Sequence, residues 1–420
     1  MANEPVVIGR PSLLRQTNVR VLLKLLRKIG PCSKADLVRA SGLSAPTVRN
    51  VVAHLLSAGL VEPIGEGVST GGRRPDMLRF KAERGCVAGV EIDKDFLHFL
   101  LTDLNGHELG NAEAALCWDA STPQGVCSQI AKSIRKLLHQ YKKTPDQLLG
   151  VAIAVPAIVN VYDGVVVSLS ALKDWNMVPL GPMLSKELKC HVTIENDTNL
   201  AAQGEYYRGA AQGEKSFIYI AIGEGVGVGA GIFLEGSIYH GSQWSAGEIG
   251  YLRVPHIPRQ HPTINEFGKL EKVLGGSGIL KSWHAGDKAV QGKPKVERAI
   301  QVFDLAAEGN VRAKQILMQR AAILSDIVLN LALILNPSII LLGGEVGSHP
   351  SLLQNAKALL AGSDFAVTRL ELGKLGSSAA LWGAISIALN STVLVPIELT
   401  AHDALRGIEG AAIYSSITPY

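Results

Sequence analysis

The stretch SKADLVRASGLSAPTVRN, residues 33–50, decides the fold of the N-terminal part of the chain. Its Ser33, followed three residues later by an aspartate, is a capping arrangement that starts a helix, and the Ser-Gly pair in its middle ends that helix. Ser44 is the next cap, and the proline two residues after it is tolerated in a first helical turn. The stretch therefore predicts one helix over residues 34–40, a tight turn, and another helix over residues 45–58.

A longer helix is predicted before this stretch and a β-hairpin after it. From Leu14 to Ile29 the apolar residues fall on one helical face and the basic residues lie largely opposite, until a Gly-Pro pair ends the helix. Two short strands at about residues 60–67 and 77–80 flank a glycine-rich tip. Three helices followed by such a hairpin predict a winged helix-turn-helix DNA-binding domain over residues 1–82.

The third helix is the predicted reader of the DNA major groove. Its predicted apolar stripe consists of Val48, Val52, Leu55 and Leu56. On its outer faces, an asparagine can pair with adenine and an arginine with guanine, although either can bind phosphate instead, and an ordinary solvated helix has the same pattern. Arginines at the wing tip suit a narrow minor groove. The candidate DNA-binding residues are Ser44, Thr47, Arg49, Asn50 and His54, with Arg73 and Arg74 in the wing.

Charge and composition favour a soluble protein of two parts. Residues 1–84 contain 14 lysines and arginines against 6 aspartates and glutamates, whereas the remaining residues contain 27 against 31. A basic arm on a slightly acidic module is typical of DNA binding, because phosphate contacts dominate nucleic-acid affinity. No apolar run reaches the roughly 18–20 residues that span a bilayer, and no secretory signal is evident, so we expect a cytoplasmic protein without a membrane partner. The five cysteines have no spacing typical of a metal site or a disulfide framework.

From about residue 83 the pattern changes to strands and helices rich in small residues. Pairs of strands at residues 87–103 and 216–234 open two halves, and each half continues with helices and buried strands such as residues 148–155. This order predicts a two-lobed α/β domain with a cleft over residues 83–391. The last segment, residues 392–420, lies outside this pattern and has no predicted role.

Three segments of this second part resemble the ROK family, named for repressors, open reading frames and sugar kinases. They are IENDTNLAAQGE at residues 194–205, AGEIG at residues 246–250 and NPSIILLGG at residues 336–344. The resemblance extends from residue 15 to about residue 390. It implies an actin-like, sugar-kinase-type (ribonuclease H-like) fold whose final helix returns to the first lobe. Family members with an N-terminal winged helix are typically sugar-responsive transcription regulators.

The resemblance also implies a sugar site. In this family an Asn-Asp pair and two glutamates hydrogen-bond the sugar hydroxyls, and the aspartate is the base in the kinases. The matching residues are Asn196, Asp197, Glu248 and Glu271, the last with a less certain alignment. Carboxylates suit the task because each can accept from two hydroxyls in a concave polar site. A capped helix start with no ligand is the alternative for the Asn-Asp pair.

The phosphate side departs from the kinases. Their Asp-x-Gly-Gly-Thr turn is Glu91-Ile92-Asp93-Lys94-Asp95 here, and their Gly-Thr-Gly segment is Gly223-Glu224-Gly225. The first loop is bulkier without its glycines, and the added carboxylates are expected to repel a polyphosphate. We therefore expect no enzymatic activity and no cofactor.

Other family positions are altered as well. Ala157, Ala171 and Tyr251 replace a glycine, an asparagine and a histidine on the sugar side. That histidine is usually a zinc ligand with three cysteines, whose positions hold Pro262, Ile264 and Lys269, so no zinc site is predicted.

Three functions follow from these patterns. The favoured one is a sequence-specific DNA-binding regulator, a repressor of carbohydrate genes, which binds a double-stranded operator and a small carbohydrate effector as a homodimer or tetramer. The second is a sugar kinase with a DNA-binding arm. The third is a ligand-free dimeric DNA-binding scaffold controlled by a protein partner, which the three altered sugar-side positions favour.

Overall fold

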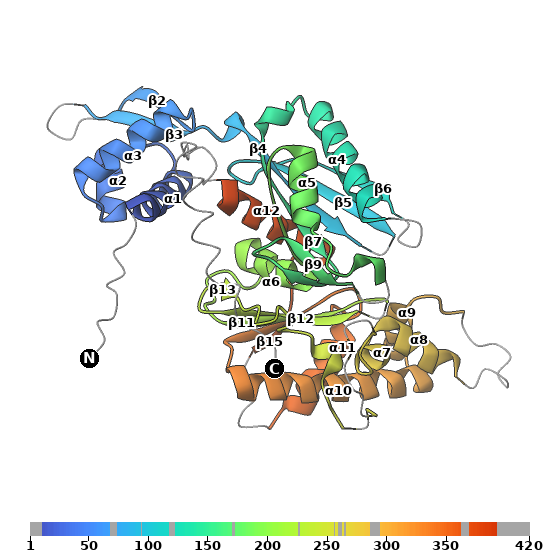
Figure 1. Cartoon of the computed structure of the whole chain (residues 1–420). Coiled ribbons are helices and arrows are strands. Elements are labelled where there is room, and N and C mark those ends of the chain that lie inside the picture. Colours follow the sequence, from blue (N-terminus) through green and yellow to red (C-terminus); the bar gives the residue numbers. More distant parts are fainter. Residues whose placement is uncertain are drawn as a thin grey trace, which may run out of the picture. The chain divides into compact units, whose positions relative to one another are not determined.

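The computed structural model describes residues 11–67, 74–93, 95–116, 122–169, 173–225, 227–255, 257–258, 263, 266–285, 295–362 and 369–392. These residues divide into two compact units (Figure 1). Among the described residues, the N-terminal unit draws on those from residue 11 to residue 85, on residues 103–105 and on residues 389–392. The other, the effector unit, draws on the described residues between 86 and 102 and between 106 and 388.

The N-terminal unit contains three helices and a small antiparallel sheet. The helices are α1 (Pro11–Ile29), α2 (Lys34–Ser41) and α3 (Ala45–Ser57). The strands β1 (Cys32–Ser33), β2 (Val61–Glu66) and β3 (Asp76–Phe80) are arranged in the order β1-β3-β2. These elements follow one another in the order expected for a winged helix-turn-helix, with the additional strand β1, which the sequence did not predict.

Local capping explains where α2 and α3 begin. The Ser33 side chain accepts a hydrogen bond from the Asp36 backbone N–H, while the Asp36 carboxylate accepts from the Ser33 N–H at 2.8 Å. Gly42, with φ 67°, ends α2 in the left-handed conformation that favours glycine. Ser44 caps α3 by accepting from the Thr47 N–H. The local signals in the sequence are therefore sufficient for this turn.

The apolar stripe of α3 differs from the predicted one by one residue. Val48, Val52 and Leu55 are buried as predicted, but Leu56 is only partly buried and Val51 is buried in addition. The prediction was wrong for Leu56 because the buried face of the helix follows a spacing of three and four residues. Val51 lies three residues after Val48 and so falls on this face, whereas Leu56 lies at its edge.

The effector unit contains two five-stranded sheets. The first has the order β10-β7-β4-β5-β6 and the second the order β13-β12-β11-β14-β15. In each sheet the first strand along the chain is the central one, the next two strands lie on one side of it, and the last two lie on the other side. The first consists of β4 (Cys86–Ile92), β5 (Phe96–Asp103), β6 (Glu108–Ala115), β7 (Leu148–Val155) and β10 (His191–Asn196). The second consists of β11 (Phe217–Ile222), β12 (Val228–Leu234), β13 (Ser237–Ile238), β14 (Ile339–Gly343) and β15 (Arg369–Leu372). This repeat is the two-halved α/β arrangement that the sequence predicted.

Helices accompany each sheet, and a separate small hairpin follows β7. The hairpin pairs β8 (Ile158–Asn160) with β9 (Val165–Ser168). The helices are α4 (Pro123–Gln140), α5 (Leu180–Leu188), α6 (Asp197–Arg208), α7 (Glu271–Leu274), α8 (Gly276–His284), α9 (Ala299–Ala307), α10 (Val311–Leu335), α11 (Pro350–Leu360) and α12 (Ala379–Thr392). Each sheet has its own cluster of buried apolar residues, as expected for two lobes.

The parallel strands position the polar residues. In the first sheet β4, β7 and β10 run parallel, and the carboxyl ends of parallel strands meet at one edge. Glu91 lies at the end of β4, and Asn196 ends β10 directly before α6 begins at Asp197. The sheet therefore brings together residues that are about a hundred positions apart in the chain.

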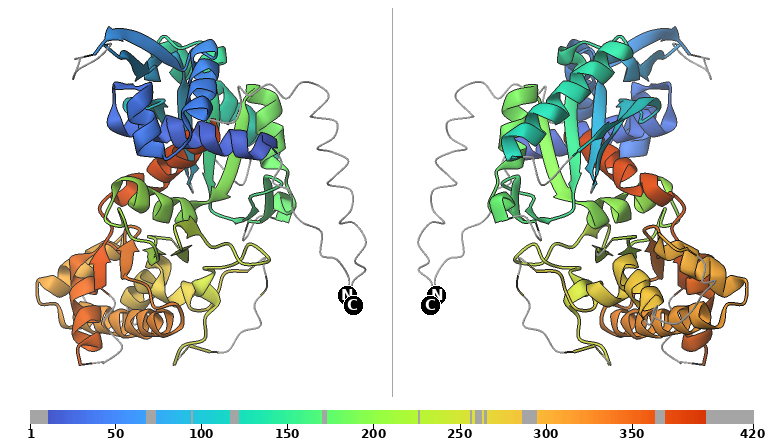
Figure 2. Two further views of the ribbon diagram at one scale, coloured as in Figure 1. Left: turned by 90° about the vertical axis from the view of Figure 1, so that its left-hand side faces the viewer. Right: turned by 90° about the vertical axis from the view of Figure 1, so that its right-hand side faces the viewer.

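Glycines allow the final helix to pack closely against α6 and the first sheet. A Cβ atom added at Gly383 would lie 1.8 Å from the Leu200 carbonyl oxygen, and one at Gly204 would lie 2.0 Å from that of Ala379. Only glycine permits such an approach of two helix backbones. A Cβ at Gly89 of β4 would meet the Leu381 carbonyl oxygen at 2.9 Å, so α12 contacts the first sheet, as Figures 1 and 2 show in red.

One described helix, α10, is long and apolar enough to cross a membrane by length and composition. Slightly more than half of its most apolar stretch, 56%, is buried inside the structure, where it packs against α9 and α11 with Leu324 and Ile327 fully buried. It also buries the guanidinium of Arg320, which donates to the Gly278 carbonyl. These contacts are those of a core helix.

Candidate functional site

The first predicted sugar residue, Asn196, caps α6. Its Oδ1 atom accepts from the Asn199 N–H at 3.0 Å, and its Nδ2 atom donates to the carbonyl of Ala157 at 3.1 Å. An asparagine amide has two N–H groups and an oxygen with two lone pairs, so one of each stays available. Asn196 thus fixes the start of α6 and still offers one donor and one acceptor to a ligand. Both capping and ligand binding are compatible with its position.

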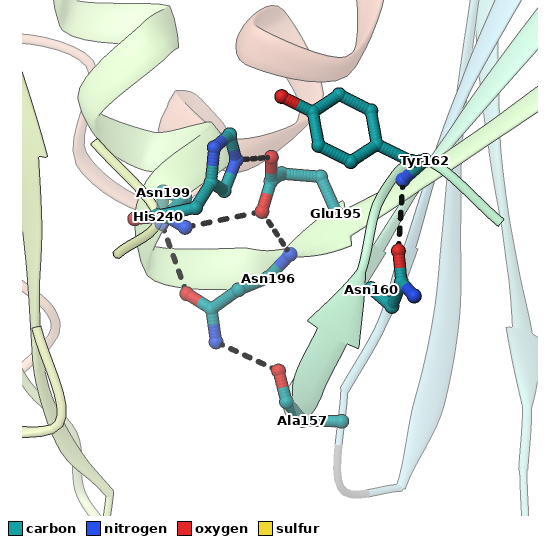
Figure 3. A network of polar contacts seen from close by, with 7 residues as sticks. All are labelled: Ala157, Asn160, Tyr162, Glu195, Asn196, Asn199 and His240. Atoms are coloured by element: carbon teal, nitrogen blue, oxygen red, sulfur yellow. Dashed lines mark hydrogen bonds and ion pairs between the residues drawn. The ribbon is translucent and has the colours of Figure 1, made fainter. Parts of the chain in front are cut away.

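Behind Asn196 lies a hydrogen-bonded network that the sequence did not reveal, drawn in Figure 3. The Glu195 side chain, 5% exposed, accepts from the Asn196 N–H at 2.8 Å and from Asn199 Nδ2 at 3.0 Å. Its second oxygen, Oε2, pairs with Nε2 of His240 at 2.6 Å. A carboxylate with this many donors is a rigid support, and it holds the first turn of α6 in place.

Asp197, Glu248 and Glu271 come together with Glu91 as a cluster of partly buried carboxyl groups. Burial raises the pKa of Asp197 to about 6, against hydrogen bonds from Thr198 that lower it. Burial, with the charges of Glu271 and Asp197 nearby, raises the pKa of Glu248 to about 7. Burial likewise raises the pKa of Glu91 to about 8, and the neighbouring charges of Asp197 and Asp93 add to the shift. Groups of this kind bind hydroxyls well, because each can accept or donate as its proton requires.

Glu271 has a partly structural role. Its Oε1 atom accepts from the Val228 N–H at 3.2 Å and its Oε2 atom from the Gly268 N–H at 3.0 Å, which ties the loop before α7 to the start of β12. Burial raises the pKa of Glu271 to about 7, although these two hydrogen bonds lower it. The charge of Asp197 contributes to the same rise, so Glu271 lies within electrostatic reach of the other site carboxyls.

The Glu224 carboxylate is bonded inside the protein, whereas the altered Gly223-Glu224-Gly225 segment suggested that it would face a phosphate group. Its two oxygens accept from the backbone N–H groups of Ala299 at 2.8 Å and Ile300 at 3.1 Å, at the N-terminus of α9. The guanidinium of Arg298 lies 3.6 Å from Oε1. The Glu224 carboxylate therefore accepts from the free N–H groups at the start of α9, and its negative charge interacts favourably with the helix dipole. The expected repulsion from Glu224 is therefore wrong in mechanism, since this charge is compensated inside the protein.

Tyr251 stands where the family has a zinc-binding histidine. Its phenol O–H lies within hydrogen-bond distance of the carbonyl oxygens of Thr263 and Glu266, so the side chain is engaged with the backbone of these two residues. Among the described residues no group of three or more histidines, cysteines and acidic residues is arranged to hold a metal. Pro262 and Ile264 lie outside the described residues, and neither side chain carries a metal-binding atom. The residues present do not fit a zinc ion.

The predicted DNA-contacting residues separate into two groups. Arg49 and Asn50 are exposed on α3, whereas the Ser44 and Thr47 hydroxyls hydrogen-bond each other at 2.8 Å in the first turn. His54 is partly buried near the end of the helix. Arg74 is exposed and lies 4.0 Å from Glu66, while Arg73 lies outside the described residues, as does Ala171 of the effector unit. The structure thus leaves the Arg49 and Asn50 side chains exposed to solvent on α3.

Sequence reasoning missed the roles of Glu195, Asn199 and His240 and the aromatic pair of Tyr162 and Trp244, and it placed Glu91 only in the altered phosphate loop, not among the site carboxyl groups. Glu195 and Asn199 were inside the recognised segment, but nothing in the sequence indicates that their side chains are buried and bonded. His240 pairs with a residue 45 positions away. A contact of that kind has no local signal.

The ROK family pattern matches residues 87–391 of the chain. A xylose repressor of Bacillus spizizenii is 27% identical over 352 residues, which cover 84% of this chain and 88% of the repressor. A glucokinase of Halalkalibacterium halodurans is 32% identical over 231 residues, covering 53% of this chain and 68% of the kinase. The crystal structure of a ROK family transcriptional regulator, described as a homologue of the E. coli MLC protein, superposes with a TM-score of 0.74 at 22% identity, over 90% of this chain and 98% of that one.

Proposed function

Because the chain belongs to the ROK family, we propose that it is a DNA-binding repressor of carbohydrate genes that responds to a sugar or sugar derivative. Support comes from the length of the match to a xylose repressor, which includes most of both chains. The observation that carries the proposal is the pairing, in one chain, of an exposed Arg49-Asn50 face on α3 with the carboxyl cluster around Asp197. The first suits DNA and the second suits hydroxyl groups.

The effector site is proposed to consist of Asn196, Asp197, Glu248 and Glu271. A sugar in this site exchanges its hydrogen bonds to water for hydrogen bonds to carboxyl groups whose pKa values burial has raised. A ligand shifts DNA binding only if it binds the two states of the protein with different affinity. The hydrogen bonds from Asn196 through Glu195 to His240 connect the first sheet to the segment that follows β13 of the second. A sugar bound at Asn196 can therefore favour one arrangement of the two lobes over another.

Phosphoryl transfer is not part of the proposed function, although a glucokinase is among the relatives. Kinases in general hold phosphates with backbone N–H groups of glycine-rich loops. Here Asp93 and Asp95 stand in the first loop, and the N–H groups of α9 are already bonded to Glu224. An ADP-release assay over pentoses and hexoses is expected to show no turnover above that of the Asp197→Asn variant.

DNA binding is tested with the full chain on duplexes selected from a random pool. We expect sequence-preferring binding that weakens steeply between about 50 and 200 mM salt, since basic side chains displace counterions. Arg49→Ala and Asn50→Ala are each expected to lose about 1–3 kcal/mol of discrimination between bases. Lys132→Ala is the matched control, because this exposed lysine lies on α4 of the effector unit. Equal binding to all duplexes by the unaltered chain would contradict the proposal.

The same proposal includes a homodimer or tetramer acting in the cytoplasm. A single helix of this size covers one half-site, and operators are commonly two-fold symmetric. Sedimentation of the full chain with and without a selected duplex measures the assembly. A protein that binds its duplex only as one copy would contradict the dimer.

A further inference from the structure

Two aromatic side chains from separate parts of the effector unit meet beside the proposed sugar site. The ring centroids of Tyr162 and Trp244 are 4.8 Å apart, with an interplanar angle of 78°, which is an edge-to-face contact. Tyr162 lies in the turn between β8 and β9, and Trp244 follows β13. The pair therefore connects the small hairpin of the first lobe to a loop of the second.

Tyr162 is 86% exposed despite this contact. Its backbone is fixed, because Oδ1 of Asn160 accepts from the N–H groups of Tyr162 at 3.1 Å and Asp163 at 3.2 Å. A large aromatic ring on a rigid turn, with most of its surface in water, gains little stability from burial. Its exposed faces are available to a ligand.

Trp244 has a backbone conformation that a bulky residue rarely adopts. Its φ is 64°, in the left-handed region that costs roughly 1–2 kcal/mol for a residue with a Cβ atom. Backbone strain of this kind is concentrated at ligand-binding and catalytic sites, so the strained backbone at Trp244 indicates a functional role for its ring. That ring also contacts the His240 ring, with centroids 5.7 Å apart.

His240 links the aromatic pair to the carboxyl site. It bonds Glu195, and Glu195 bonds the backbone of Asn196 directly before Asp197. Figure 3 shows the Tyr162 ring projecting toward Glu195 and His240, on the side away from the contact between Asn196 and Ala157. Trp244 is therefore connected to Asn196 through His240 and Glu195, and Tyr162 reaches the same chain of contacts through Trp244.

We propose that the exposed ring of Tyr162, supported by its edge-to-face contact with Trp244, forms a second subsite that stacks on the second ring of a glycoside, so that the preferred effector is a disaccharide or a related glycoside rather than a free monosaccharide. The face of an aromatic ring is electronegative, and the C–H groups on the flat face of a pyranose are its natural partner. Asn196 and the carboxyl groups bind the hydroxyls of the first ring. This inference rests on the proposed sugar response and specifies the class of sugar.

The test is calorimetric titration of the full chain with D-xylose, D-glucose, xylobiose, cellobiose and maltose. At least one disaccharide is expected to bind about tenfold tighter than its own monosaccharide, which corresponds to one aromatic contact of about 1.4 kcal/mol. Tyr162→Ala and Trp244→Gly remove this preference and leave monosaccharide affinity within about twofold. Tyr162→Phe keeps the ring and keeps the preference.

Glycine is chosen at position 244 because it accepts a positive φ without strain, and this relief offsets part of the packing that is lost with the ring. Monosaccharides that bind as tightly as every disaccharide would overturn the aromatic subsite and leave the sugar response standing. A disaccharide preference that survives both ring removals would also overturn it. If no sugar binds at all, both the subsite and the proposed function fail.

Discussion

Glu195 and His240 are joined by a 2.6 Å contact between Oε2 and Nε2, which links β10 of the first sheet to the segment after β13 of the second. Glu195 is 5% exposed at its side chain and His240 is 22% exposed. The same carboxylate holds the N-terminal turn of α6, where Asn196 and Asp197 lie. The contact therefore couples the arrangement of the two lobes to the geometry of the proposed sugar site.

Removing His240 is expected to destabilise the effector unit. His240→Ala leaves one oxygen of Glu195 without its partner in a buried position, which costs about 1–3 kcal/mol. His240→Gln keeps a donor and is expected to recover part of the loss. Urea unfolding of the full chain measures both variants, with His139→Ala on the exposed face of α4 as the control. An unfolding curve for His240→Ala that coincides with the control would contradict this role.

The stability of the effector unit is expected to fall as pH rises from 5 to 8. The folded-state pKa values of Glu91, Glu248 and Glu271 lie above the ordinary value of a glutamate, at about 8, 7 and 7. A raised pKa means that the fold favours the protonated group, so its contribution is complete below pH 4 and is lost through pH 6–8. Thermal melting across this pH range checks the direction. A melting temperature that rises steadily toward pH 8 would be the opposite result.

Glu91→Gln isolates one member of this cluster. The amide cannot ionise, so the variant is expected to be more stable than the unaltered chain at pH 8, by about 1.4 kcal/mol for each unit by which the fold raises the pKa of Glu91, and to gain little at pH 5. Glu308→Gln, at an exposed position directly after α9, is the control. The difference between the two pH values identifies the carboxyl group as the source.

Glu224 is expected to stabilise α9 as a distant cap. Glu224→Ala frees the N–H groups of Ala299 and Ile300 and costs about 1–2 kcal/mol, while Glu224→Gln keeps an acceptor and costs less. Hydrogen exchange of the two amides reports the effect locally. Unchanged protection at both amides in Glu224→Ala would show that the cap is not needed.

Ser44 is expected to act on DNA binding through the helix rather than through a base. Ser44→Ala removes the acceptor for the Thr47 N–H and its hydroxyl contact, so it lowers the stability of the N-terminal unit by about 1 kcal/mol. DNA affinity is expected to fall for all duplexes alike, in contrast to Arg49→Ala. A change of base preference in Ser44→Ala would instead assign the hydroxyl to direct readout.

Local patterns predicted much of the fold. The apolar run of residues 148–155 became β7 with these bounds, because a continuous apolar segment carries its own signal. The short β1, the β8–β9 hairpin and α5 were not predicted. Their stability depends on neighbours elsewhere in the chain, such as the pairing of Cys32 with Leu78.

The site was predictable only where a family motif marked it. Asn196, Asp197 and Glu248 lie in recognised segments, and the mutual electrostatic effects of the carboxyl groups place Asp197 near Glu248. The partner of Glu224 is the start of a helix 75 residues further along the chain, so its sequence context suggested repulsion where the fold provides a cap. Contacts of this range depend on topology and are invisible to periodicity or spacing.

The most direct test of the central claim is the DNA affinity of the full chain, measured by fluorescence anisotropy on a selected duplex with and without each sugar. We predict that at least one sugar changes the affinity by about 5-fold or more, a coupling of about 1 kcal/mol, and that Asp197→Asn abolishes the response while keeping DNA binding. Arg49→Ala is expected to show the reverse, with sugar binding kept and duplex preference lost. DNA affinity that is unchanged by every sugar, or a response that persists in Asp197→Asn, would contradict the account.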